Sequence, residues 1–157
     1  MLIKVGNGLD DILIQDWYKS SSNKIEQIKF FDGTIWDVAT IESKQMVLGD
    51  DGNNLIYGTS GGDIFDAGKG DDSIYGYNNQ SGSGNDTYLF GIGDGKDVIY
   101  DTDSSVNNDV IKFKSGIAAS DISISRPFGN AGDLLIKING TQDSITVKNW
   151  YQNEYSK

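Results

Sequence analysis

The chain has 157 residues, enough for one domain with a buried core, and its composition is acidic and rich in glycine. A formal charge of −10 disfavours nucleic-acid binding, because the phosphates would be repelled. The absence of His and Cys excludes disulfide bonds and the Ser–His and Cys–His nucleophiles of many hydrolases. We therefore expect no enzymatic activity, although a paired-carboxylate glycosidase remains formally compatible with the composition.

Alternating apolar and polar residues predict short strands along most of the chain. Asp32-Gly33 and Asn139-Gly140 are typical of the tight turns that close hairpins. Residues 116–121 are expected to form one helical turn. In chain order the predicted strands are 2–5, 11–15, 25–31, 34–38, 54–57, 63–66, 72–75, 86–90, 97–100, 109–113, 121–126, 133–138 and 143–149.

Residues 49–75 consist of three consecutive nine-residue units, GDDGNNLIY, GTSGGDIFD and AGKGDDSIY. Each unit has Gly at its fourth position and a bulky apolar residue at its eighth. The sixth positions are polar and hold Asn54, Asp63 and Asp72. A glycine-rich turn followed by a short strand at a fixed period predicts a coil that stacks on itself. Stacking would bring the carboxylates together, where they repel unless a cation lies between them.

Two later units depart from this pattern. Five extra residues, Gly76 to Gln80, precede SGSGNDTYL, in which Asp86 is sixth. The next stretch, FGIGDGKDVIY, carries its carboxylate, Asp97, two places late. The alternative is a flexible Gly/Asp-rich linker. A linker does not explain why Ile56, Phe65, Ile74 and Tyr88 share one phase of the period.

These units resemble the calcium-binding nonapeptide repeats of the RTX family of secreted bacterial proteins. The resemblance implies a right-handed parallel β-roll in which one coil takes two units and Ca²⁺ lies between unit n and unit n+2. It pairs Asn54 with Asp72, Asp63 with Asp86, and the unit of Asp72 with that of Asp97, and on the order of 2–4 ions are expected. The first pair should be weakest, because an amide carries no charge. The implied metal-site residues are Gly49, Asp51, Asn54, Gly58, Ser60, Asp63, Gly68, Gly70, Asp72, Gly82, Gly84, Asp86, Gly93 and Asp97.

A second repeat lies outside the first. Residues 2–24 align without a gap on residues 135–157, and the Trp-Tyr pair at Trp17 recurs at Trp150. We expect the chain to be a fragment of a longer tandem array, with neighbouring modules as partners. The alternative is chance similarity between two amphipathic strand pairs. The recurring residues are Leu2, Ile3, Lys4, Asp10, Ile12, Trp17, Tyr18 and Lys24, matched by Leu135, Ile136, Lys137, Asp143, Ile145, Trp150, Tyr151 and Lys157.

Both ends also resemble the haemolysin-type calcium-binding-related segment that flanks RTX arrays. The resemblance rests on KIEQIKFFDGTIW (24–36), DVIKF (109–113), SDISISR (120–126), DLLIKI (133–138) and DSITVKNWY (143–151). Together these patterns predict one compact all-β domain: a flanking segment at 1–48, a short calcium-bound parallel β-roll at 49–100 and a second flanking segment at 101–157. Antiparallel strands at both ends would cover the open edges of the roll.

The predicted function is a calcium-binding module, secreted or on the bacterial cell surface, that folds on meeting extracellular calcium and supports type I secretion. We expect a monomer without a membrane span, since no apolar run approaches the roughly 20 residues needed. Two alternatives stay open: an adhesin or polysaccharide-binding module that uses calcium for rigidity, and an accessory module of a secreted enzyme or toxin. Trp17, Trp36 and Trp150 fit either core packing or sugar stacking.

Overall fold

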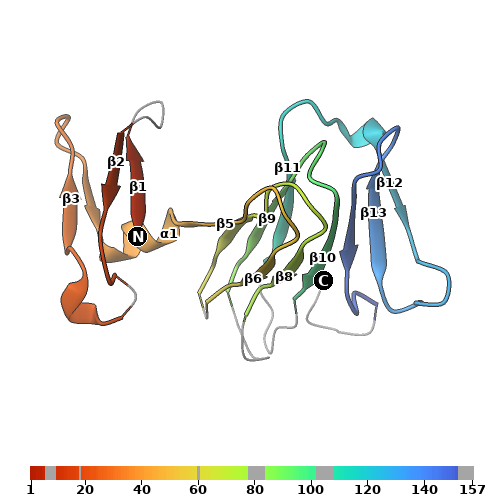
Figure 1. The fold of residues 1–157 in the computed structure, drawn as a ribbon, viewed down its shortest axis with the longest axis horizontal. Helices are drawn as coiled ribbons and strands as arrows, with labels where there is room; N and C mark the ends of the chain where they lie inside the picture. Colours follow the sequence, from red (N-terminus) through yellow and green to blue (C-terminus); the bar gives the residue numbers. More distant parts are fainter. Residues whose placement is uncertain (6–9, 18, 60, 78–83, 102–107, 152–157) are drawn as a thin grey trace. The chain divides into compact units, whose positions relative to one another are not determined.

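The computed structural model describes residues 1–5, 10–17, 19–59, 61–77, 84–101 and 108–151. Two compact units follow one another along the chain, Met1–Lys44 and Gln45–Lys157 (Figure 1). Strands dominate both units and helix is almost absent from the described residues, so the all-β prediction is confirmed. The second unit contains both the segment predicted as a β-roll and the flanking segment predicted after it.

The first unit is built from two antiparallel hairpins around a small core. Trp17 is fully buried and packs with Ile14 and Ile41. Gly33 has a φ of +87°, which suits the tight turn between the second pair of strands. The elements are β1 (Leu2–Val5), β2 (Asp10–Leu13), a 3₁₀ turn (Ser21–Asn23), β3 (Gln27–Lys29), β4 (Ile35–Asp37) and α1 (Val38–Ser43), with β1 paired to β2 and β3 to β4.

The second unit holds two sheets, and consecutive strands from β5 to β11 alternate between them. One sheet, in the order β11-β9-β7-β5, is entirely parallel. The other has the order β12-β13-β14-β10-β8-β6 and is parallel from β14 onward. The strands are β5 (Met46–Leu48), β6 (Leu55–Tyr57), β7 (Ile64–Asp66), β8 (Ser73–Tyr75), β9 (Thr87–Phe90), β10 (Lys96–Tyr100), β11 (Val110–Phe113), β12 (Ile122–Ser125), β13 (Leu134–Ile138) and β14 (Ser144–Val147).

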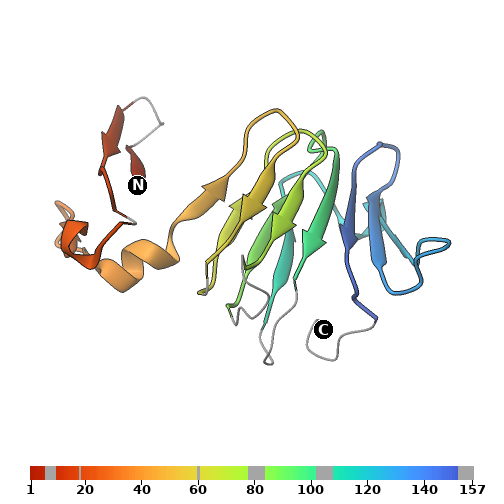
Figure 2. The same ribbon diagram turned by 60° about the horizontal axis from the view of Figure 1, so that its bottom comes forward.

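The nine-residue period produces this alternation directly. Each unit supplies one turn and one strand, so unit n pairs in parallel with unit n+2. Leu55 therefore lies opposite Ser73, and Ile64 lies opposite Thr87. Figure 2 shows these strands, coloured yellow to green, following one another in a stack. The predicted strands overlap every described strand except β5, and the predicted helical turn at 116–121 contains a 3₁₀ turn at Ala119–Asp121.

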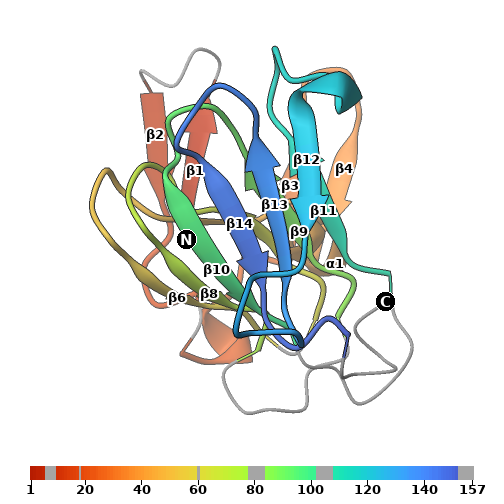
Figure 3. The same ribbon diagram turned by 90° about the vertical axis from the view of Figure 1, so that its right-hand side faces the viewer.

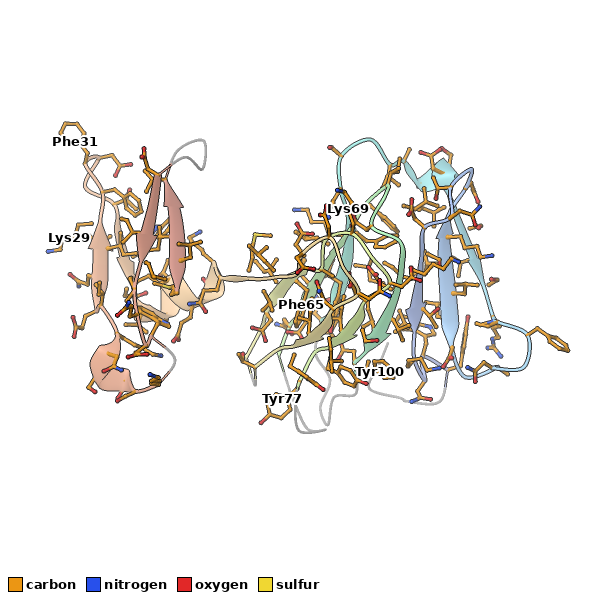
Figure 4. The ribbon with its side chains drawn as sticks, viewed as in Figure 1. Lys29, Phe31, Phe65, Lys69, Tyr77 and Tyr100 are labelled. Atoms are coloured by element: carbon orange, nitrogen blue, oxygen red, sulfur yellow. The ribbon has the colours of Figure 1, made fainter. Side chains whose placement is uncertain are left out.

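The eighth position of each unit forms the core between the sheets. Phe65 is fully buried and stacks on Tyr88, with 5.0 Å between ring centroids. Figure 4 shows Phe65 within the stack of strands. In the other sheet the eighth positions Ile56 and Ile74 and the residue in register with them, Ile99, are all buried. One apolar residue per unit thus becomes a continuous apolar column, because parallel strands in register repeat the same side-chain orientation.

The turns stack as tightly as the strands. Gly70 has a φ of +120°, and a Cβ placed on it would lie 2.6 Å from the carbonyl oxygen of Gly52. Gly95 repeats this one coil later, with a φ of +101° and a Cβ position 2.1 Å from the oxygen of Gly70. Only glycine combines positive φ with such close backbone approach at low cost.

A hairpin covers the last coil strand of the mixed sheet. β14 pairs in parallel with β10, and β13 and β12 extend the sheet in antiparallel fashion (Figure 3). Gly140 has a φ of +79° in the predicted Asn139-Gly140 turn. The hairpin contributes Ile136, Ile138 and Ile145 to the core. Among the described residues, no helix reaches the length and apolar character of a membrane span.

Replacing Phe65 by Ala should lower the free energy of unfolding by about 3–5 kcal/mol, because a fully buried aromatic ring leaves a cavity in a close-packed column. Urea unfolding in millimolar calcium measures the loss. Phe128→Ala is the matched control, since Phe128 is fully exposed and its removal should change little. Equal effects of the two substitutions would contradict the packing described for the column.

Candidate metal centre

A polar residue at the start of each strand from β6 to β11 carries the chemistry of the second unit: it lies just before the strand, except in β10, where Asp97 is the second residue. These residues form two columns: a first column of Asn54, Asp72 and Asp97 in the mixed sheet, and a second column of Asp63, Asp86 and Asp109 in the parallel sheet. In both columns a carboxylate accepts a hydrogen bond from the backbone N–H of the column residue one coil earlier. The carboxylates are therefore oriented by backbone groups that the parallel register puts beside them.

The first column is continuous across three coils. The N–H of Asn54 donates to Oδ1 of Asp72 at 2.7 Å, and the N–H of Asp72 donates to Oδ1 of Asp97 at 3.1 Å. Asp97 lies in register with Asp72, so its late position in the sequence is absorbed by the longer turn before β10. Asp72 is only 1% exposed, and its Oδ2 has no hydrogen-bond partner. A buried carboxylate oxygen without a partner is costly and requires an explanation.

The second column crosses the inserted residues without losing register. The N–H of Asp63 donates to Oδ1 of Asp86 at 2.8 Å, and the N–H of Asp86 donates to Oδ1 of Asp109 at 2.9 Å. Asp109 is not among the predicted site residues. The sequence does contain a sign of it. Asp109-Val110-Ile111 has a carboxylate followed two residues later by an apolar residue, as at the sixth and eighth positions of a unit, but it lies in the segment predicted to flank the roll.

Three carboxylates converge at the end of the second column. Asp86, Asp101 and Asp109 each offer one oxygen, and these oxygens lie within 4.8 Å of one another. Asp86 and Asp101 are buried. We call these three residues the aspartate triad. Asp101, which the sequence analysis also missed, follows β10 directly and has no periodic signal of its own.

Neighbouring groups shape the space around the triad. The hydroxyl of Tyr88 donates to Oδ2 of Asp101 at 2.8 Å. A Cβ on Gly76 would lie 2.8 Å from Oδ2 of Asp86, so the position requires glycine. Asp101 and Asp109 border a cavity of about 230 Å³ whose other walls include Ile99 and side chains of β11, β13 and β14. The triad therefore borders open space without being a surface cluster.

Burial makes the charged forms of these groups unfavourable. Burial raises the pKa of Asp86 to about 7, and the negative charges of Asp101, Asp63 and Asp109 act in the same direction. Burial likewise raises the pKa of Asp97 to about 7, with further contributions from Asp72 and Asp94. Hydrogen bonds from the column N–H groups oppose both shifts only in part.

Lysine side chains pair with other aspartates of the second unit. Nζ of Lys114 lies 2.7 Å from Asp66 and 2.8 Å from Asp94. Nζ of Lys69 contacts Asp51 at 2.7 Å, and both of these side chains are exposed. Asp51, a predicted site residue, therefore lies apart from the two columns.

The predicted glycines line the turns rather than offering side chains. A Cβ on Gly49, Gly58, Gly68, Gly70 or Gly84 would meet a backbone oxygen of an adjacent coil at 2.6 Å or less. Gly93 differs, because its N–H donates to Oδ2 of Asp143 at 2.9 Å and a Cβ would meet nothing within 4 Å. Ser60 and Gly82 lie outside the described residues.

The donor set fits a hard divalent cation. Carboxylate and backbone oxygens are the ligands that Ca²⁺ prefers, six to eight at a time. The partnerless Oδ2 of Asp72 and the converging oxygens of the triad are what a cation would satisfy. The residues that would hold it are Asp72 and Asp97 in the first column, and Asp63 and the triad in the second.

Comparison with known families assigns the ends of the chain. The sequence model described as "Haemolysin-type calcium binding protein related domain" matches residues 1–40 and 133–157. These two segments are therefore similar to the haemolysin-type calcium-binding-related domain, as the sequence analysis expected. Residues 41–132, which carry the nonapeptide units and the triad, lie outside this match. No curated protein matches the chain.

The raised pKa values predict an inverted pH dependence in the absence of metal. Below about 3.8 Asp86 and Asp97 are protonated in both folded and unfolded states, and the folded state retains its protons up to about pH 7. The stabilisation from this protonation is therefore lost as the pH rises through about 7. In excess EGTA the fraction of folded chain should therefore be larger at pH 5 than at pH 8.

Calcium should oppose that trend, because metal binding requires deprotonated carboxylates and therefore strengthens with pH. The folded fraction, measured by circular dichroism at the two pH values with EGTA and with calcium, gives both slopes. Asp86→Asn combined with Asp97→Asn should flatten the slope in EGTA. A slope that survives this double substitution would contradict the assignment of the titrating groups.

Proposed function

We propose that residues 45–113 form a calcium-loaded parallel β-roll, and that the chain is a calcium-binding module of a secreted protein that folds when it meets extracellular calcium. The observation that carries this proposal is the aspartate triad together with the partnerless carboxylate oxygen of Asp72. The family match at both ends of the chain supports the same ion, because the matched domain is described as haemolysin-type calcium-binding related.

The energy of binding is adequate for a folding switch. A site with a Kd near 10⁻⁴ M, at about tenfold higher free calcium, gains about 1.4 kcal/mol. Three such sites would gain roughly 4 kcal/mol, which is comparable with the stability of a small domain. Binding energy then becomes folding energy, because the unfolded chain holds no preformed site.

The location follows from the calcium gradient. At the submicromolar calcium of a bacterial cytoplasm, the same sites gain almost nothing. The acidic repeats would remain unfolded there, in a state suited to export through a type I secretion channel, and would fold outside the cell. The net charge of −10 favours the unfolded chain until cations neutralise it.

The polysaccharide-binding alternative receives little support from the tryptophans. Trp17 is fully buried in the core of the first unit, and Trp36 is partly buried against the same core. Trp150 is partly buried against the core of the second unit. All three lie in packing positions rather than forming an exposed aromatic platform.

Calcium titration should order the chain. Circular dichroism in EGTA is expected to show a largely unfolded repeat region, and strand signal should appear cooperatively between about 10⁻⁵ and 10⁻³ M calcium. Magnesium at the same concentrations is the control, since it demands a tighter octahedral site and should order the chain much less. Equal strand content in EGTA and in calcium would contradict calcium-dependent folding.

Asp86→Asn should separate calcium binding from folding. The substitution removes a buried like charge, so the chain in EGTA should be at least as stable as the wild type. Its gain in calcium should be smaller by about 1.4 kcal/mol, the contribution of one site. Asp51→Asn removes the same charge from an exposed side chain outside the columns and should leave the calcium gain unchanged. Thermal unfolding with and without calcium reports both, and an equal loss in the two variants would count against the triad.

A further inference from the structure

The chain carries the same hairpin twice. β1–β2 and β13–β14 are related by the 133-residue repeat, and their strand registers agree: Ile3 pairs with Ile12 as Ile136 pairs with Ile145. The backbone agrees after the hairpins as well. Among the described residues, only Asp16 and Asn149 have positive φ without being glycine, at 55° and 58°, and they too are 133 residues apart. The repeat seen in the sequence is therefore also present in the backbone structure.

The second copy of the hairpin is docked on the coil. β14 pairs in parallel with β10, the last coil strand of the mixed sheet. Asp143 clamps the turn before β10, because its two carboxylate oxygens accept the N–H groups of Gly93 at 2.9 Å and Gly95 at 3.0 Å. On the apolar face, Ile138 and Ile145 are 2% and 1% exposed.

The first copy presents the same groups without such cover. Val5 and Ile12, the counterparts of Ile138 and Ile145, are 45% and 53% exposed. Asp10, the counterpart of the clamping Asp143, is also exposed. Within the described residues, β1 and β2 form a sheet of two strands, so β2 lacks the neighbour that β14 has in β10. The other end of this face is covered by the core of its own unit, where Ile14 is buried and Met1 and Ile3 are partly buried.

We propose that the β1–β2 hairpin docks on the open last strand of a second nonapeptide coil, the strand equivalent to β10 in a second copy of this repeat unit. In this chain β14 already occupies β10, so the partner is a coil whose last strand is free. β2 pairs with that strand in parallel, Asp10 accepts the N–H groups of the preceding glycine turn, and Val5 and Ile12 become buried. The hairpin thus joins one coil to the module that follows it.

The known β10–β14 register makes the docking specific. Val98 lies opposite Thr146, whose counterpart is Leu13, so Leu13 is expected opposite Val98 of the second coil. Ile12 lies one residue away and on the other face of its strand. Calcium takes no part in these contacts, because the β10–β14 pairing and the Asp143 clamp are formed by protein groups alone. Under the proposed function calcium is needed only to keep the coil folded, so all docking experiments are done in millimolar calcium.

A graft tests whether the first hairpin can dock. In the full chain, residues 135–151 are replaced by residues 2–18, a segment of equal length, and thermal unfolding is compared with the wild type in the same buffer. The expected midpoint lies within a few degrees of wild type. The double substitution Asp143→Ala with Ile145→Asp in the native chain gives the thermal unfolding midpoint expected when the hairpin is not docked on β10. A graft that melts at that lower midpoint would overturn the proposal.

Disulfide cross-linking tests the strand register. Because the chain has no cysteine, only the introduced pair can form a disulfide. In the graft, Val98→Cys is combined with Leu13→Cys or, as the off-face control, with Ile12→Cys. Val98→Cys with Thr146→Cys in the native chain is the positive control. Disulfide formation with Leu13→Cys at least tenfold above Ile12→Cys supports the docking, and equal or reversed yields contradict it.

The same pair tests docking between molecules. Full-length Leu13→Cys chain is mixed with a full-length acceptor carrying Val98→Cys and Ile145→Asp, which frees its last coil strand. A mixed disulfide dimer is expected, and Asp10→Ala with Ile12→Asp in the donor should reduce its yield at least tenfold. No dimer from an acceptor that circular dichroism shows to be folded would overturn the proposal. If the acceptor is unfolded, the graft experiment described above tests the proposal instead.

Discussion

The fold of the second unit depends on one constraint: parallel strands in register put identical positions of successive units on top of one another. A carboxylate that occurs at a fixed period must therefore stack on other carboxylates. The backbone N–H of the preceding coil satisfies one oxygen of Asp72, Asp97, Asp86 and Asp109. The other carboxylate oxygens remain as negative charge in a buried column. A cation is the simplest group that neutralises this charge.

The same translation that stacks the charges also stacks the apolar side chains. Phe65 on Tyr88, and Ile56, Ile74 and Ile99 in the opposite sheet, form the core between the sheets. Tyr75 continues this regularity on another face, stacking on Tyr100 at 4.4 Å between ring centroids. Attraction in the apolar columns and repulsion in the acidic columns thus have a common origin. This balance is the physical basis of the proposed folding switch, because a cation in the acidic columns would remove the repulsion and leave the attraction.

The last strand of the coil is covered by a hairpin rather than by another coil. A stacked coil leaves an open strand edge, and β14 covers that edge through backbone pairing and the Asp143 clamp on Gly93 and Gly95. The family match covers this hairpin and its earlier copy, but not the coil between them. Modules with two versions of one hairpin can be joined in series, because each coil can then be covered by the segment that follows it. In the proposed docking, the hairpin rather than the coil defines how modules connect.

The periodic part of the fold could be read from the sequence. The nine-residue period predicts short strands in a coil that stacks on itself, because both depend on spacing along the chain. The resemblance to the RTX repeats adds the pairing of unit n with unit n+2, and with it the stacking of Asn54 with Asp72 and of Asp63 with Asp86. Even the duplicated hairpin is visible as the recurrence of Leu2 to Lys24 at Leu135 to Lys157. The sequence patterns did not predict α1 or β5, which are short and lie between the patterned segments.

Only the tertiary structure decided which carboxylates meet. Asp101 follows one sheet's strand and Asp109 precedes a strand of the other, so their approach to Asp86 depends on how the chain crosses between sheets. Asp97 falls into register because a longer turn absorbs its late position, whereas Asp51, equally acidic in the sequence, lies outside the columns with Lys69. Spacing along a chain defines neighbours within a sheet, but contacts between sheets depend on the path of the turns, which residue type and period do not encode.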